Sequence, residues 1–107
     1  MVLMVTTSWF PSGKSEEVGK KFLEVTKKYP DDPSIAKPIL RVGVRPTQDG
    51  MKVIAISEIQ KGKYEEAMSL SIQMLLEYSD IEGFRYEIET FMSGKEALPL
   101  VGLAMPK

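Results

Sequence analysis

The alternation of side chains between a mainly apolar and a mainly charged side makes residues 84–92 the clearest structural signal in the chain. Successive side chains of a β-strand point to opposite faces, so this alternation predicts a half-buried strand. The side chains on its apolar face would be Phe84, Tyr86, Ile88, Thr90 and Met92. Everything before this strand is then expected to supply the elements that cover that face.

Three further strands are predicted upstream, at residues 2–9, 39–45 and 51–59. The first and third of these are apolar on both faces, which is typical of central strands that are covered on both sides. The middle one alternates, with Leu40, Val42 and Val44 on one face, and follows Pro38, which suits an edge strand. Residues 46–50 contain an Asp-Gly pair and predict a hairpin loop between the second and third strands.

Two helices are predicted, at residues 15–29 and 64–79. Val18, Phe22, Val25 and Tyr29 recur at spacings of four, three and four residues, which places them on one apolar stripe of the first helix. The second helix is apolar over most of its circumference, as expected for a helix buried on more than one side. In a chain this small, we expect the second cover to come from another subunit.

The element order β-α-β-β-α-β predicts a single α+β domain over residues 1–107. Two interleaved right-handed β-α-β units give a four-stranded antiparallel sheet with both helices on one face, and with strands 2–9 and 51–59 central. Two helices leave the other face uncovered, so we expect two sheets to pair face to face in a dimer. Residues 93–107 form an apolar C-terminal extension, which packs either on its own domain or, as we favour, on a partner subunit.

The residue types that are missing exclude several chemistries. The chain has no Cys and no His, which excludes disulfides, thiolate nucleophiles, zinc-thiolate sites and any Ser-His-Asp triad, so we expect no metal site. A net charge of −1 predicts no nucleic-acid partner. No stretch approaches the ~20 apolar residues of a membrane span. Residues 1–5 lack the basic leader of a signal peptide, so the expectation is a cytoplasmic protein.

In element order, size and the two-sided apolarity of its middle strands, the chain resembles the dimeric α+β-barrel superfamily over residues 2–92. That superfamily includes cofactor-independent and haem-degrading monooxygenases, lactone isomerases and small-ligand sensor domains. The resemblance implies a site between the sheet and the helices or within the barrel. Its monooxygenases commonly use Asn, His and Trp, of which only Trp9 is present here, so no family site carries over and no cofactor is expected.

Charged and aromatic side chains on these elements are the candidates for a ligand site. Arg41, Arg45 and Glu87 are predicted on the helix-free face together with Arg85 and Glu89, where Arg forks could bind an organic acid. Pairing across the sheet, or solvation at its edges, is the alternative. The full candidate set is Trp9, Arg41, Arg45, Glu58, Tyr64, Met68, Tyr86 and Glu87.

The other members of that set are predicted from their neighbours. The aromatic residues and Met68 could line an apolar pocket, although side chains of these types are also ordinary core residues. Glu58 ends an apolar strand face and could act there as a general base, or could simply be exposed at the strand end.

Three functions are consistent with these residues. The first is a homodimer, or higher homo-oligomer, that binds a small apolar or weakly acidic ligand. The second is a cofactor-independent enzyme of the monooxygenase or isomerase type that uses Tyr, Arg and Glu. The third is a structural oligomerisation module.

Overall fold

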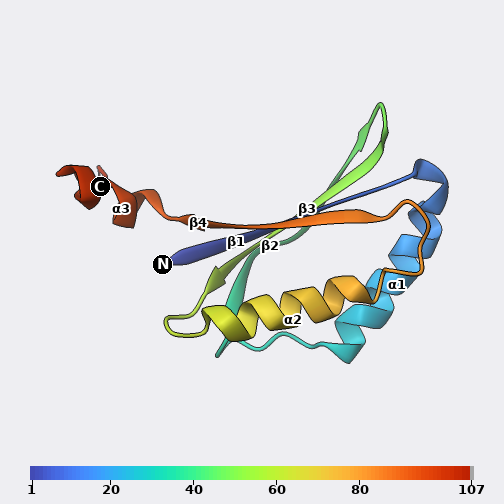
Figure 1. Cartoon of the computed structure of the whole chain (residues 1–107), viewed down its shortest axis with the longest axis horizontal. Coiled ribbons are helices and arrows are strands. Elements are labelled where there is room, and N and C mark those ends of the chain that lie inside the picture. Colours follow the sequence, from blue (N-terminus) through green and yellow to red (C-terminus); the bar gives the residue numbers. More distant parts are fainter. Residues whose placement is uncertain (107) are drawn as a thin grey trace.

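The computed structural model describes residues 1–106, in which a four-stranded antiparallel sheet carries two long helices on one face (Figure 1). The strand order is β2-β3-β1-β4, so the predicted topology and the two central strands are confirmed. The strands are β1 (Val2–Phe10), β2 (Ala36–Thr47), β3 (Gly50–Ile59) and β4 (Arg85–Met92). The helices are α1 (Ser15–Lys28) and α2 (Tyr64–Leu76), with short turns η1 (Ser12–Lys14), α3 (Gly94–Ala97) and η2 (Leu98–Val101).

Helix α1 packs its predicted apolar stripe against the sheet. Val25, at the centre of that stripe, is only 2% exposed, and Val18 is also buried. Acidic residues in the first turn and lysines in the last turn complement the helix dipole. Helix α2 buries Ala67 and Leu75, but its second apolar side remains open to solvent, as the 52% exposure of Leu76 shows.

Two clusters of buried side chains hold the helices to the sheet at opposite ends. One contains Phe10, Val18, Val25, Tyr78 and Ile81, and the other contains Met4, Ile59 and Ala67. Across residues 1–106, no large side chain is less than 2% exposed. The core therefore consists of two separate clusters of buried side chains between the helices and the sheet, rather than one closely packed interior.

Strand β2 departs from the regular alternation that its sequence predicts. Its pairing with β3 shifts register between Pro38 and Leu40 and again between Leu40 and Gly43, so that it carries extra residues opposite β3. The prediction of one unbroken face along this strand is therefore wrong. Arg41, which was predicted on the helix-free face beside Arg45, instead forms an ion pair with Asp31 in the loop after α1.

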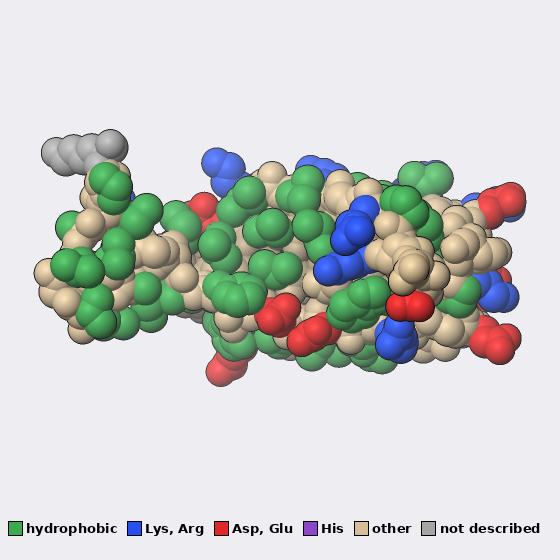
Figure 2. Space-filling view, turned by 90° about the horizontal axis from the view of Figure 1, so that it is seen from above, with side chains coloured by type: hydrophobic (Ala, Val, Ile, Leu, Met, Phe, Trp, Pro, Cys, Tyr) green, Lys and Arg blue, Asp and Glu red, His purple; other side chains and the backbone are tan. Residues whose placement is uncertain are grey.

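The helix-free face of the sheet is apolar at its centre. Val5 pairs with Ile56 and Thr7 with Ile54, and all four side chains point away from the helices. Figure 2 looks onto this face, where hydrophobic side chains spread over the sheet and over a C-terminal arm, residues 94–106.

The C-terminal arm projects beyond the end of the sheet (Figure 1). Its apolar side chains are open to solvent, with Leu100 74% and Val101 72% exposed. The arm is tied to the sheet by an ion pair between the amino group of Met1 and Glu96. Nothing in residues 1–106 forms a helix with both the length and the hydropathy needed to cross a membrane.

Candidate functional site

A cavity of about 710 Å³ lies between the sheet and the two helices. Its floor is the helix-facing side of β1 and β3, and its walls come from α1, α2 and β2. Val44 lines the cavity and is 59% exposed, so the cavity opens to solvent along β2. A volume of this size lies within the range of about 300–1,000 Å³ that is typical of small-molecule sites.

Apolar side chains dominate the lining because the inward positions of the strands and helices converge on this space. They include Phe10, Phe22, Val25, Val53, Ala55 and Met74. A few hydroxyl groups lie among them, from Thr6, Ser8, Ser57 and Ser71. The Ser71 hydroxyl donates to Met4 Sδ over 3.2 Å, whereas Thr6 and Ser8 bring hydroxyls of β1 to the floor of the cavity.

An ion pair fastens the end of α1 to the end of α2 beside this cavity. Lys28 Nζ donates to Glu77 Oε2 over 2.8 Å, and the Tyr29 hydroxyl donates to the same oxygen over 3.2 Å. The hydrogen bond from Lys28 lowers the pKa of Glu77, and the same bond raises the pKa of Lys28. Because Tyr29 lines the cavity, this contact fixes one of its walls.

A stack of aromatic rings closes one end of the cavity. The rings of Tyr78 and Phe84 lie 4.7 Å apart at 9°, and Phe84 in turn stacks on Phe10 at 6.3 Å. Tyr78 is 7% exposed, and this burial raises the pKa of its hydroxyl from 10.0 to about 12. A neutral Tyr78 is therefore part of the folded core.

The titration of Tyr78 gives a prediction for alkaline pH. Because the pKa of Tyr78 is raised in the folded state, its buried neutral hydroxyl contributes fully to the free energy of unfolding below pH 10. That contribution is lost as the pH rises through 12. The wild type should lose about 1 kcal/mol more stability than Tyr78→Phe between pH 9 and pH 11. Urea unfolding at the two pH values measures this difference.

Tyr64→Phe is the matched control, since Tyr64 is 44% exposed at the start of α2. This variant is expected to lose as much stability as the wild type over the same pH range. Equal losses in the wild type and in Tyr78→Phe would contradict the burial of a neutral hydroxyl at position 78.

The predicted candidate residues fall into three groups. Arg41 lines the edge of the cavity, where it pairs with Asp31. Trp9 and Arg45 lie in a smaller depression on the helix-free face, together with Lys52 and Arg85. The candidates that line neither space are Glu58, Tyr64, Met68, Tyr86 and Glu87.

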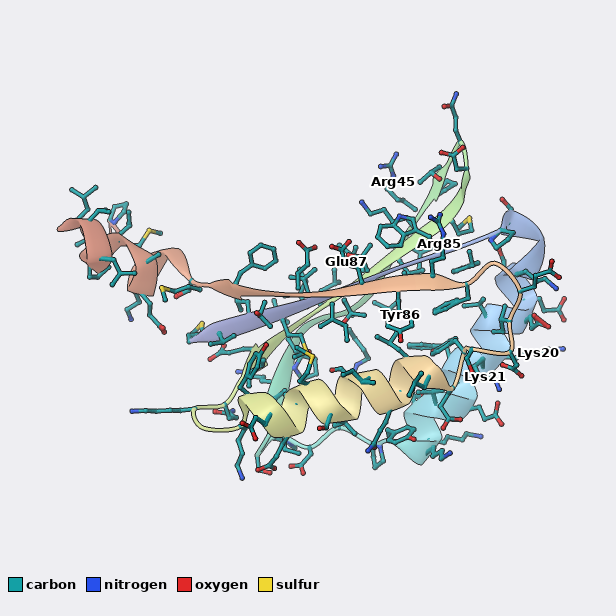
Figure 3. All side chains as sticks on the ribbon, viewed as in Figure 1. Lys20, Lys21, Arg45, Arg85, Tyr86 and Glu87 are labelled. Carbon is teal, nitrogen blue, oxygen red and sulfur yellow. The ribbon has the colours of Figure 1, made fainter. Side chains whose placement is uncertain are left out.

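Tyr64 is exposed at the start of α2, and the positions of the other four follow from the side of the sheet to which each strand residue points and from local packing. Glu58 pairs with Leu3, which puts it on the helix-free face. Met68 packs against the cluster around Met4. Tyr86 and Glu87 are neighbours on β4 and point to opposite faces, with Glu87 away from the helices (Figure 3). Their involvement in ligand binding stays a prediction.

Sequence reasoning did not single out several residues that the fold brings to these spaces. Ala55, Ser8 and Ser57 line the main cavity. The sequence signal that could have identified them is their position on the alternate residues of β1 and β3 that face the helices. Lys52 lies in the smaller depression because it pairs directly with both Trp9 and Arg45. Only the strand register reveals that neighbourhood.

Comparison with known proteins places the chain by its fold. It superimposes on the crystal structure of a candidate antibiotic biosynthesis monooxygenase from Deinococcus radiodurans with a TM-score of 0.59 and 12% identity, over 88% of this chain and 93% of that one. The likeness is one of fold. The de novo designed protein Foldit4 matches with a TM-score of 0.54 and 18% identity, over 86% of this chain and 96% of that one. No family model matches the chain, and no curated protein does.

Proposed function

We propose that this protein is a homodimer that binds a small, mostly apolar molecule in the cavity between its sheet and its helices. The observation that carries the proposal is the cavity itself, with its volume of about 710 Å³ and its apolar lining. A bound molecule would remove that lining from water, which is worth about 25 cal/mol for each Å² of apolar surface. The gap between the two core clusters is then the space that a ligand fills.

The polar groups of the cavity are suited to orienting such a molecule. The hydroxyls of Thr6, Ser8 and Ser71 can each accept or donate a hydrogen bond, as is usual for the few polar groups of an apolar site. Arg41 stands at the edge, where its charge is balanced by Asp31. A weakly acidic group on the ligand could compete with Asp31 for this guanidinium.

The apolar side chains that the helices leave open support the dimer, because a second copy of the chain would cover them. The centre of the helix-free face carries the apolar side chains of Val5, Ile54 and Ile56, with Glu87 and Glu89 of β4 beside them. The C-terminal arm carries exposed apolar side chains beyond the sheet and would pack on the partner subunit. Face-to-face pairing of two sheets would bury both surfaces.

An aromatic side chain placed in the cavity tests ligand binding. Ala55 lies on the cavity floor, so Ala55→Phe fills the space that a ligand would occupy. The uncharged fluorescent probe N-phenyl-1-naphthylamine is expected to bind the wild type saturably, and the variant at least about tenfold more weakly. Fluorescence titration of both proteins measures the two affinities.

Thr90→Phe is the control, because it adds the same ring to a strand of this sheet but lies outside the cavity lining. It is expected to bind the probe like the wild type. Equal affinities of the wild type and Ala55→Phe, with both proteins folded by circular dichroism, would overturn the cavity as the binding site. Native mass spectrometry of the purified protein adds the subunit number and any retained small molecule.

A cofactor-independent monooxygenase is the second candidate, and the fold shared with the Deinococcus radiodurans structure favours it. Tyr29 and Tyr78 line the cavity, so they are the tyrosines that a substrate bound there could contact. Oxygen consumption with a small phenol as substrate, measured with and without the protein, separates the two candidates. Under the binding proposal, the protein does not raise the rate of uptake.

A further inference from the structure

Three cationic side chains and the single tryptophan form a row across all four strands on the helix-free face. Arg45 pairs with Lys52, Lys52 pairs with Trp9, and Trp9 pairs with Arg85. Cross-strand partners share a face, so all four side chains point to the same side. They line a depression of about 350 Å³ together with Thr47 and Asp49.

This row is electrostatically unfavourable when it is empty. Arg45 and Lys52 lie directly opposite each other, and like charges at such positions destabilise a sheet. Among residues 1–106, none of the ion pairs includes Arg45, Lys52 or Arg85, so these three cations have no carboxylate partner. Asp49 is the one carboxylate of the depression, so the site keeps an excess of positive charge.

The shape of the sheet gathers these charges around a hollow. The β2–β3 hairpin rises from the sheet on its helix-free side (Figure 1). Figure 3 shows Arg45 of β2 and Arg85 of β4 on this same side, and both line the depression. The guanidinium of Arg85 lies over the ring of Trp9, 5.8 Å from its centroid. Figure 2 shows a group of Lys and Arg side chains on this face, away from the C-terminal arm.

We propose that Trp9, Arg45, Lys52 and Arg85 form a binding site for a small organic oxyanion, a carboxylate or a phosphate, whose apolar part packs on Trp9. Guanidinium forks match the two oxygens of such a group, and the lysine adds a point charge. The bound anion would neutralise the repulsion within the row. This site is on the opposite face of the sheet from the cavity, so it does not depend on ligand binding there. It lies on the face that the proposed dimer would pair, but away from the C-terminal arm and outside the apolar centre of that face (Figure 2).

The tryptophan itself reports on occupancy, because it is the only one in the chain. Its fluorescence is recorded while sodium phosphate or sodium benzoate replaces sodium chloride at constant ionic strength. The wild type is expected to show a saturable change, and Arg45→Gln to bind the anion at least about tenfold more weakly. A response to phosphate alone identifies a phosphate group as the ligand chemistry, and a response to benzoate identifies a carboxylate.

Lys37→Gln is the matched control, since Lys37 is an exposed cation at the other end of β2. It is expected to bind the anion like the wild type. Thermal unfolding gives an independent readout with Lys52→Gln, which should raise the melting temperature in chloride and abolish the further rise that the anion causes in the wild type.

Three results would overturn the proposal. The first is a fluorescence change no larger with phosphate and benzoate than with chloride. The second is equal weakening in Arg45→Gln and Lys37→Gln. The third is a shift in subunit number by sedimentation in Arg45→Gln without any anion response in the wild type, which would make the row a contact between subunits.

Discussion

Gly50→Ala is expected to destabilise the fold by about 3 kcal/mol or more. Gly50 has a φ of +128°, a conformation that L side chains rarely adopt, at the turn from β2 into β3. A Cβ there would lie 2.5 Å from the carbonyl oxygen of Phe10, a backbone atom that cannot move aside without disturbing β1. Urea unfolding followed by circular dichroism measures the loss.

Two other glycines separate the clash from the conformational strain. Gly62 has a φ of +79°, but open space surrounds its Cβ position, so Gly62→Ala should cost only about 1–2 kcal/mol. Gly19 lies inside α1 with nothing within 4 Å of its Cβ position, and Gly19→Ala should stabilise the protein by about 1 kcal/mol. A cost for Gly50→Ala no greater than that for Gly62→Ala would show that β1 yields to the added methyl group.

Ile56→Asp is expected to raise the dissociation constant of the proposed dimer at least about 100-fold. Ile56 lies at the centre of the helix-free face, opposite Val5 of β1. A carboxylate buried there between two sheets would lose its hydration without gaining a partner, which is costly. In an isolated chain the same carboxylate would face water, so the fold itself should survive.

Sedimentation velocity at micromolar concentration measures the effect, with Leu23→Asp as the control. Leu23 is an apolar residue of α1 that is 62% exposed, so this variant introduces the same charge on the other side of the molecule. It is expected to sediment like the wild type. A monomeric wild type at this concentration would contradict the dimer, and a dimeric Ile56→Asp would place the interface elsewhere.

Periodicity along the chain was sufficient to predict the elements and their order. The alternation of residues 84–92 marks a strand whose two faces meet different surroundings, and β4 (Arg85–Met92) begins one residue later than predicted. Apolarity on both faces identified β1 and β3 as the central strands, which the order β2-β3-β1-β4 confirms. These features are local, because side-chain direction repeats every two residues in a strand and about every 3.6 in a helix.

Strand β2 shows where such local reasoning fails. Its residues alternate like those of a regular strand, yet the register shifts on both sides of Leu40 and Arg41 turns to Asp31. A bulge depends on how two strands with separate sequences pair, and the sequence of one strand does not contain that information.

The candidate sites divide in the same way. The sequence by itself determined that β1 and β3 would turn apolar side chains to both faces, and that His and Cys chemistry is absent from the chain. The width of the cavity and the meeting of Arg45, Lys52, Trp9 and Arg85 were decided only by the tertiary structure. The physical reason is that both depend on distances between residues far apart in sequence, which strand register and the separate packing of the two helix ends impose together.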